Sequence, residues 1–149
     1  MTTRATIDAI VAQPALAIVG MSRSGKKFGN AAYRELSGKG YRVYPIHPGA
    51  PTIDGHPSYA SFADLPEPVD AALVVVPPAQ SSQVVREAAA AGIHYVWLQQ
   101  GAESADVLKV CEELGIHTVA GECILMFAQP RGIHKLHKWL RGLVRTIPG

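Results

Sequence analysis

Residues 17–30 read AIVGMSRSGKKFGN and combine a strand, a turn and the start of a helix. Its apolar start, Ala17 to Val19, is typical of a buried strand, and Gly20 allows a sharp turn directly after it. From Phe28 onward the apolar residues recur at helical spacing. A strand that leads into a helix in this way is the start of a βαβ unit. The segment therefore predicts an α/β domain with a parallel sheet.

The rest of the chain repeats this alternation of strand and helix. We expect strands at Ala15–Gly20, Tyr41–Ile46, Ala71–Val76, Tyr95–Leu98 and His117–Ala120. Gly40, Gly92 and Gly115 directly follow the three main helices, where a left-handed residue commonly ends a helix. This pattern predicts a Rossmann-like, doubly wound, five-stranded parallel sheet with flanking helices. Right-handed crossovers then suggest the strand order 3-2-1-4-5, with a ligand crevice at the carboxyl ends of the first and fourth strands.

Two segments depart from the regular alternation. A short helix is expected over Thr3–Ala12, before the first strand. Five prolines between Pro48 and Pro68 leave room for a loop and one short helical turn around Tyr59–Leu65. The length fits one domain over residues 1–149, with its core at about residues 15–123.

Composition excludes several classes of protein. The chain is 48% apolar and 17% charged, as globular proteins are. Its apolar runs fall short of the roughly 20 residues of a membrane-spanning helix, and residues 1–13 lack the apolar core of a signal peptide. We therefore expect a cytoplasmic protein. Cys111 and Cys123 are too few for a disulfide framework or a complete structural zinc site.

Basic charge is concentrated at the C-terminal end. Residues 123–149 hold five of the fourteen cations and no acid, which leaves nine cations against twelve acids elsewhere. The apolar spacing there predicts a C-terminal amphipathic helix at about residues 131–146. Packing on the domain, in a homodimer or on a protein partner is the favoured interpretation, and neither nucleic acid nor membrane is expected. An adaptor that binds RNA or membrane is the alternative. His134 and His137 alone do not predict a metal site.

The turn after the first strand is the candidate anion site. Arg23, Lys26 and Lys27 place three of the nine cations of the body in five consecutive positions. Ser22 and Ser24 add hydroxyl groups, and the start of the following helix adds backbone N–H groups. A basic cluster alone is more often a solvated surface loop. Its place after the first strand of a doubly wound sheet favours a phosphate site instead.

The spacing of this turn excludes two common phosphate motifs. No G-x-G-x-x-G can be written through Gly20, Gly25 and Gly29. A Walker loop needs Ser or Thr where Lys27 stands.

The residues at the ends of the later strands narrow the choice of ligand. The second strand ends in IHPG, residues 46–49, without the carboxylate that an NAD site usually places there. This leaves NADP or coenzyme A (CoA), and His47 either contacts a ribose phosphate or is a loop histidine without a ligand. After the third strand, Pro77 and Pro78 form either an apolar wall for adenine or a simple break before the helix. The fourth strand leads to amides and a flexible glycine at residues 99–101.

Together these turns resemble the stand-alone CoA-binding protein family, whose domain is similar to the N-terminal CoA-binding domain of the succinyl-CoA synthetase α subunit. The resemblance covers about residues 15–123. It is carried by the order and spacing of IVGMS at 18–22, IHPG at 46–49, VVPP at 75–78, VWLQQG at 96–101 and GEC at 121–123.

The resemblance implies a CoA site built from several turns. The residues it implies for the diphosphate are Gly20, Met21, Ser22, Arg23 and Ser24, with added charge from Lys26 or Lys27. Those implied near the phosphorylated ribose are His47 and Pro48, although the synthetase-type loop is richer in glycine and lysine there. Those implied at the adenine are Val76 and Pro77. Those implied along the pantetheine arm and at its thiol are Gln99, Gln100, Gly101 and Cys123.

The resemblance does not imply an enzyme, because the synthetase reaction requires a phosphorylated histidine on a further domain that this chain lacks. Glu122 beside Cys123 disfavours a thiolate, so a buried structural cysteine is the favoured interpretation, with a mixed disulfide to the CoA thiol as an alternative. We expect a non-catalytic binding or regulatory module for CoA or an acyl-CoA. The alternative is an NADP-dependent oxidoreductase, although Tyr95 and the histidines show no recognisable catalytic spacing.

Overall fold

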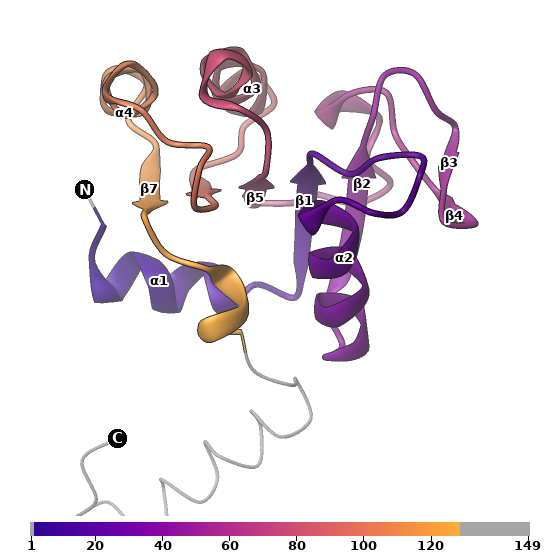
Figure 1. Cartoon of the computed structure of the whole chain (residues 1–149). Helices are drawn as coiled ribbons and strands as arrows, with labels where there is room; N and C mark the ends of the chain where they lie inside the picture. Colours follow the sequence, from indigo (N-terminus) through magenta and orange to yellow (C-terminus); the bar gives the residue numbers. More distant parts are fainter. Residues whose placement is uncertain (1, 129–149) are drawn as a thin grey trace, which may run out of the picture.

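A five-stranded parallel sheet lies between two layers of helices (Figure 1) in this computed structural model, which describes residues 2–128. In spatial order the strands are β2 (Arg42–Ile46), β1 (Ala15–Val19), β5 (Ala71–Val74), β6 (Tyr95–Leu98) and β7 (His117–Ala120). One face of the sheet is covered by α1 (Arg4–Val11) and α2 (Phe28–Gly38). The other is covered by α3 (Pro78–Ala90) and α4 (Ala105–Glu113). The predicted Rossmann-like α/β class is confirmed.

The strand order 3-2-1-4-5 suggested by the sequence is wrong in detail. Numbered among the five main strands, the order is 2-1-3-4-5, because β5 pairs with β1 and β2 lies at the edge. Pro45 gives the physical reason. It has no N–H for a further ladder, and its carbonyl accepts a hydrogen bond from the Tyr59 N–H (2.9 Å) on the side away from β1. The topological switch therefore lies at the carboxyl ends of β1 and β5, and the expected ligand crevice moves there with it.

Alternation along the strands divides the core between the two faces. Leu16, Ile18, Leu73 and Trp97 belong to one cluster with the apolar residues of α1 and α2. The opposite face is formed by small and β-branched residues that pack under α3 and α4, among them Ala17, Ala72, Val74 and Val96. All residues of β5 are buried, as expected for a central strand of a parallel sheet.

The helix boundaries follow the predicted signals at most positions. Gly40, Gly92 and Gly115 have φ values of 96°, 87° and 68°, which confirms them as left-handed residues that follow helices. Side chains cap α1 and α4, where Thr3 accepts from Thr6 N (3.1 Å) and Ser104 from Val107 N (3.2 Å). In contrast, α2 and α3 begin without a side-chain cap. Both of these uncapped ends lie at the carboxyl edge of the sheet.

The proline-rich crossover contains a hairpin that the sequence analysis did not predict. Strands β3 (Thr52–Ile53) and β4 (His56–Pro57) pair antiparallel around Asp54 and Gly55, whose φ values are 52° and 76°. An Asp-Gly pair is a strong signal for such a two-residue turn. The expected helical turn is also present, as a 3-10 helix, η1 (Phe62–Asp64).

The predicted C-terminal helix at residues 131–146 lies outside the described residues. Over residues 2–128, no helix combines the length and the apolar character needed to span a bilayer. In the same range no three or more His, Cys, Asp and Glu side chains group as metal ligands would.

Replacing Leu73 by Ala tests the central position of β5. Leu73 is 1% exposed, so truncation should lower the free energy of unfolding by about 2–5 kcal/mol through lost burial and a cavity. The matched control is Leu108→Ala on α4, where the residue is 40% exposed and the expected change is about 0.5 kcal/mol. Urea unfolding measures both. Equal small losses would contradict a central β5 and fit an edge strand instead.

Candidate functional site

Two glycines allow the turn after β1 to pack closely against the end of β5 and the start of α2. Gly20 has a φ of 125°, and a Cβ added there would lie 2.2 Å from the Val75 carbonyl oxygen, just beyond β5. Gly29, in the first turn of α2, packs on Gly20 itself, since its added Cβ would lie 2.6 Å from the Gly20 carbonyl oxygen. Side chains at either position would force the strands and helix apart. Gly20 and Gly29 thus allow the same close packing of strand, turn and helix as the glycines of a G-x-G-x-x-G motif, although their spacing differs.

A buried amide fixes the shape of this turn. Asn30 is fully buried; its Oδ1 accepts from the Ser22 N–H and its Nδ2 donates to the Ser22 carbonyl, both at 2.9 Å. These two bonds hold one peptide segment on both its donor and its acceptor. Asn30 was not among the predicted site residues, and its only signal in the sequence is an amide in the first turn of the helix that follows the loop.

The outer side of the turn presents hydroxyl groups and cations. The Oγ atoms of Ser22 and Ser24 are hydrogen-bonded at 2.8 Å, and the Lys26 N–H donates to Ser24 Oγ at 3.4 Å. Lys26 and Lys27 are exposed. Lys27 is also the N-cap of α2 and provides no side-chain cap. The Asn30 N–H donates to the Lys27 carbonyl at 3.0 Å, so the N–H groups that precede it, at Phe28 and Gly29, are the ones that an anion at this helix start would meet.

Arg23 and His47 meet at the turn that follows β2. The Arg23 guanidinium donates to the Gly49 carbonyl oxygen. The Gly49 N–H donates to His47 Nδ1 at 3.0 Å, so a neutral His47 ring carries its proton on Nε2. Two donors therefore converge at the end of β2. Arg23, predicted with the diphosphate group, also reaches the predicted ribose-phosphate residue His47.

A rigid apolar turn follows β5. Ser81 is fully buried, and its Oγ donates to the Pro77 carbonyl at 3.2 Å and to that of Val76 at 3.4 Å. Pro77 is exposed and Val76 is half-buried. Because Val75 packs on Gly20, this turn lies directly beside the Gly20 turn, where the predicted adenine wall would be needed.

The turns after β6 and β7 are tied together by amides. Gln99 is only 4% exposed, and its Oε1 accepts from the Ile124 N–H at 3.1 Å. Gln100 Nε2 donates to the Gly121 carbonyl at 3.3 Å. Both predicted pantetheine amides therefore brace the loop that carries Cys123. Cys123 itself is only partly buried, where the sequence favoured a buried position.

The structure brings the predicted site residues to one edge of the sheet. In spatial order they occupy the turns at residues 47–49, 20–27, 75–77, 99–101 and 121–123. His47 and Cys123 mark opposite ends of this row. Four strand spacings separate β2 from β7, which is about 19 Å. Such a row suits an extended ligand.

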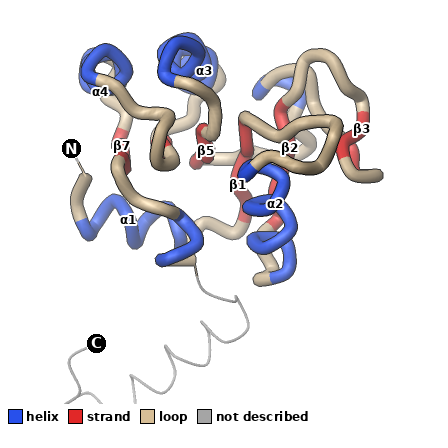
Figure 2. The backbone as a smooth tube through the Cα atoms, in the orientation of Figure 1, coloured by secondary structure: helices blue, strands red, loops and turns tan. Residues whose placement is uncertain are grey.

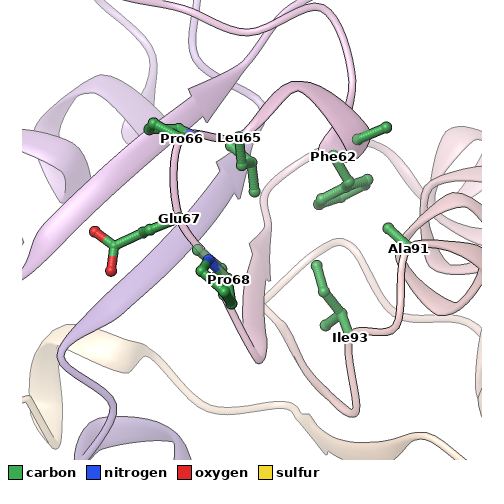
Figure 3. A pocket seen from close by; sticks show the side chains of 9 residues that line it. Phe62, Leu65, Pro66, Glu67, Pro68, Ala91 and Ile93 are labelled. Atoms are coloured by element: carbon green, nitrogen blue, oxygen red, sulfur yellow. The ribbon is translucent and has the colours of Figure 1, made fainter.

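The structure also contains a hollow of about 470 Å³ away from this edge (Figure 3). It lies beside the segments that enter β5 and β6 and is lined mainly by apolar side chains, including Phe62, Leu65 and Ile93. Glu67 points away from Phe62 and Ile93. Its carboxylate instead accepts from Arg42 Nε and Nη2 at 2.7 and 2.8 Å. The hollow contains none of the predicted site residues.

Comparison with known proteins identifies the family. Residues 15–129 match the family described as the CoA binding domain. The chain belongs to this family. A curated relative of this CoA-binding domain is an ADP-forming acetate–CoA ligase of Archaeoglobus fulgidus, 27% identical over 121 residues. The alignment covers 74% of the present chain and 18% of the ligase, so the chain spans less than a fifth of that relative's length.

Solved structures include small proteins of similar extent. A conserved hypothetical protein of Pyrococcus furiosus is 38% identical, with a TM-score of 0.71 over 75% of this chain and 97% of that protein. A hypothetical protein of Pyrococcus horikoshii is 27% identical, with a TM-score of 0.76 over 84% and 89% of the two chains.

Alanine at Gly20 should be far more damaging than alanine at Gly101. Both glycines have positive φ, at 125° and 95°, but only Gly20 has atoms within 4 Å of an added Cβ. Left-handed strain alone should cost about 1–2 kcal/mol at Gly101, and the Val75 contact should add about 1–3 kcal/mol at Gly20. Chemical unfolding measures the difference, and equal costs would show that the strand contact is unimportant.

Proposed function

We propose that this CoA-binding domain holds CoA or an acyl-CoA along the carboxyl edge of its sheet. One observation carries the proposal: the Gly20 turn, fixed by Asn30 and Gly29, presents the uncapped start of α2 at the topological switch. Ligands of doubly wound sheets bind at such a switch, and phosphates bind at helix N-termini. The family match supplies CoA as the ligand.

The diphosphate group would lie at the turn of residues 20–27. The backbone N–H groups at the start of α2 point toward this turn, as they do at any helix N-terminus, and Ser22 and Ser24 add hydroxyl donors. Lys26 and Lys27 supply positive charge from the solvent side. Charge-assisted hydrogen bonds of this kind are about twice as strong as neutral ones.

The phosphorylated ribose would lie beside Arg23 and His47. Residues 47–49, directly after β2, hold no carboxylate to bind free ribose hydroxyls, and the two donors that meet at Gly49 favour a negatively charged group instead. Val76 and Pro77 would border the adenine. The pantetheine arm would then run past Gln100 and Gly101 toward Cys123, and Gln99 would hold that path from below.

We further propose that the domain binds its ligand without a chemical step of its own. The edge offers hydrogen-bond donors, cations and an apolar wall, which are groups that bind and orient. Burial raises the pKa of the Cys111 thiol, which makes this cysteine a poor nucleophile.

Thermal unfolding with added ligands tests this function. CoA at about 100 times its Kd should stabilise the protein by about 2.7 kcal/mol and raise its melting temperature. NAD should have no effect, because the site has donors for a phosphate where NAD presents ribose hydroxyls. Stabilisation by NADP without stabilisation by CoA would favour the oxidoreductase alternative and contradict the proposal.

Arg23→Gln should remove much of the preference for the ribose phosphate. We expect CoA affinity to fall about tenfold through loss of a charge-assisted bond, while dephospho-CoA affinity changes by less than about threefold. Titration calorimetry with both ligands measures the two affinities. Arg86→Gln, at an exposed position on α3, is the control for lost charge. Equal losses for the two ligands would place Arg23 at the diphosphate instead.

A further inference from the structure

Asp54, in the β3–β4 hairpin, bonds to the helix that follows the Gly20 turn. Its Oδ2 lies 3.3 Å from Asn30 Nδ2 and 3.3 Å from Arg34 Nη1, and both of these donors belong to α2. The hairpin and the loop between β1 and α2 lie side by side (Figure 2). Asp54 therefore contacts the same amide that fixes Ser22.

The Asp54 carboxylate also lies close to the loop at Gly25. A Cβ added at Gly25 would lie 2.8 Å from Asp54 Oδ1, so the loop backbone passes directly over the carboxylate. Arg34 Nη1 lies 3.4 Å from the Gly25 carbonyl and so links the same two segments. The loop is thus held at Ser22 by Asn30 and at Gly25 by Arg34, and Asp54 bonds to both of these side chains.

The negative charge of Asp54 by itself should lower the affinity for the proposed ligand, which is also negatively charged. A negative group beside a diphosphate raises the cost of binding, and the ion pair with Arg34 offsets only part of it because both side chains are partly exposed, Arg34 at 56% and Asp54 at 28%. The contacts of Asp54, in contrast, all favour one shape of the loop. Position and charge therefore predict effects of opposite sign on ligand affinity.

We propose that Asp54 is a positioning residue for the CoA diphosphate. It orients Asn30, which sets the Ser22 peptide, and it supports the backbone at Gly25. The inference rests on the proposed function and adds to it the hairpin, which no family motif quoted above includes. The acceptor oxygen of Asp54 matters in this role, and its negative charge does not.

Two variants separate the two effects. Gly and Asn both tolerate the φ of 52° at this position, so neither substitution strains the turn. Asp54→Gly removes the acceptor and should weaken CoA binding about tenfold. Asp54→Asn keeps an acceptor oxygen for Asn30 and loses the charge, so its affinity should equal or exceed that of the unchanged protein. Titration calorimetry measures both.

The controls distinguish this role from general damage. Glu113→Ala removes an exposed carboxylate at the end of α4, on the opposite edge of the sheet, and should leave affinity unchanged. Asp54→Gly should weaken CoA and dephospho-CoA equally, since both carry the diphosphate. Without ligand, amide hydrogen exchange at residues 22–30 should accelerate in Asp54→Gly and not in Asp54→Asn.

Distinct outcomes would overturn distinct claims. If the unchanged protein binds no CoA, the proposed function fails, and the positioning role with it. If it binds CoA but Asp54→Gly binds as tightly or more tightly, only the positioning role fails. Equal weakening in the Gly and Asn variants would also overturn that role, because the charge and not the acceptor would then matter.

Discussion

The contact between the Gly20 turn and the Val75 backbone is the constraint on which the rest of the site depends. A Cβ added at Gly20 would lie 2.2 Å from the Val75 carbonyl oxygen, so the chain can turn away from β1 beside the end of β5 only where it has no side chain. Because the turn is this tight, Gly29 in the first turn of α2 packs directly on Gly20. The helix therefore begins at the topological switch between β1 and β5. A looser turn would displace the helix N-terminus from that switch, where the peptide dipoles act on a ligand.

Buried polar side chains hold the remaining turns in the same way. Among the described residues, Asn30, Ser81, Gln99 and Thr118 are the buried polar ones. The first three each bond to the backbone of a different turn at the carboxyl edge, at Ser22, Pro77 and Ile124. A buried polar group without a partner costs about 1–3 kcal/mol, so each turn is held in the form that satisfies its side chain. The edge is therefore prepared before any ligand arrives.

Much of the architecture could be predicted from the sequence, because strand and helix patterns and the glycines after the helices are local signals. The strand order could not be derived from crossover handedness, since both orders use right-handed crossovers. Pro45 was the signal that could have corrected the order, because a proline within a strand indicates that the strand lies at the edge of its sheet. The turns of the site were also predictable as positions after strands. The contact of Asp54 with Asn30 was not, because it joins residues 24 positions apart through an unpredicted hairpin.

The polar and glycine residues at this edge form two groups, an inner group that holds the loops and an outer group that faces solvent. The inner groups act on backbone atoms, so they require particular side chains at few positions, such as Gly20 and Asn30. The outer groups, Arg23, Lys26 and Lys27, are exposed and contribute little to packing. Their replacement changes the charge of the edge without a cavity or a clash. A fold similarity with a TM-score of 0.76 at 27% identity is compatible with this arrangement, in which a few contacts fix the loops and the exposed residues set the charge of the proposed binding edge.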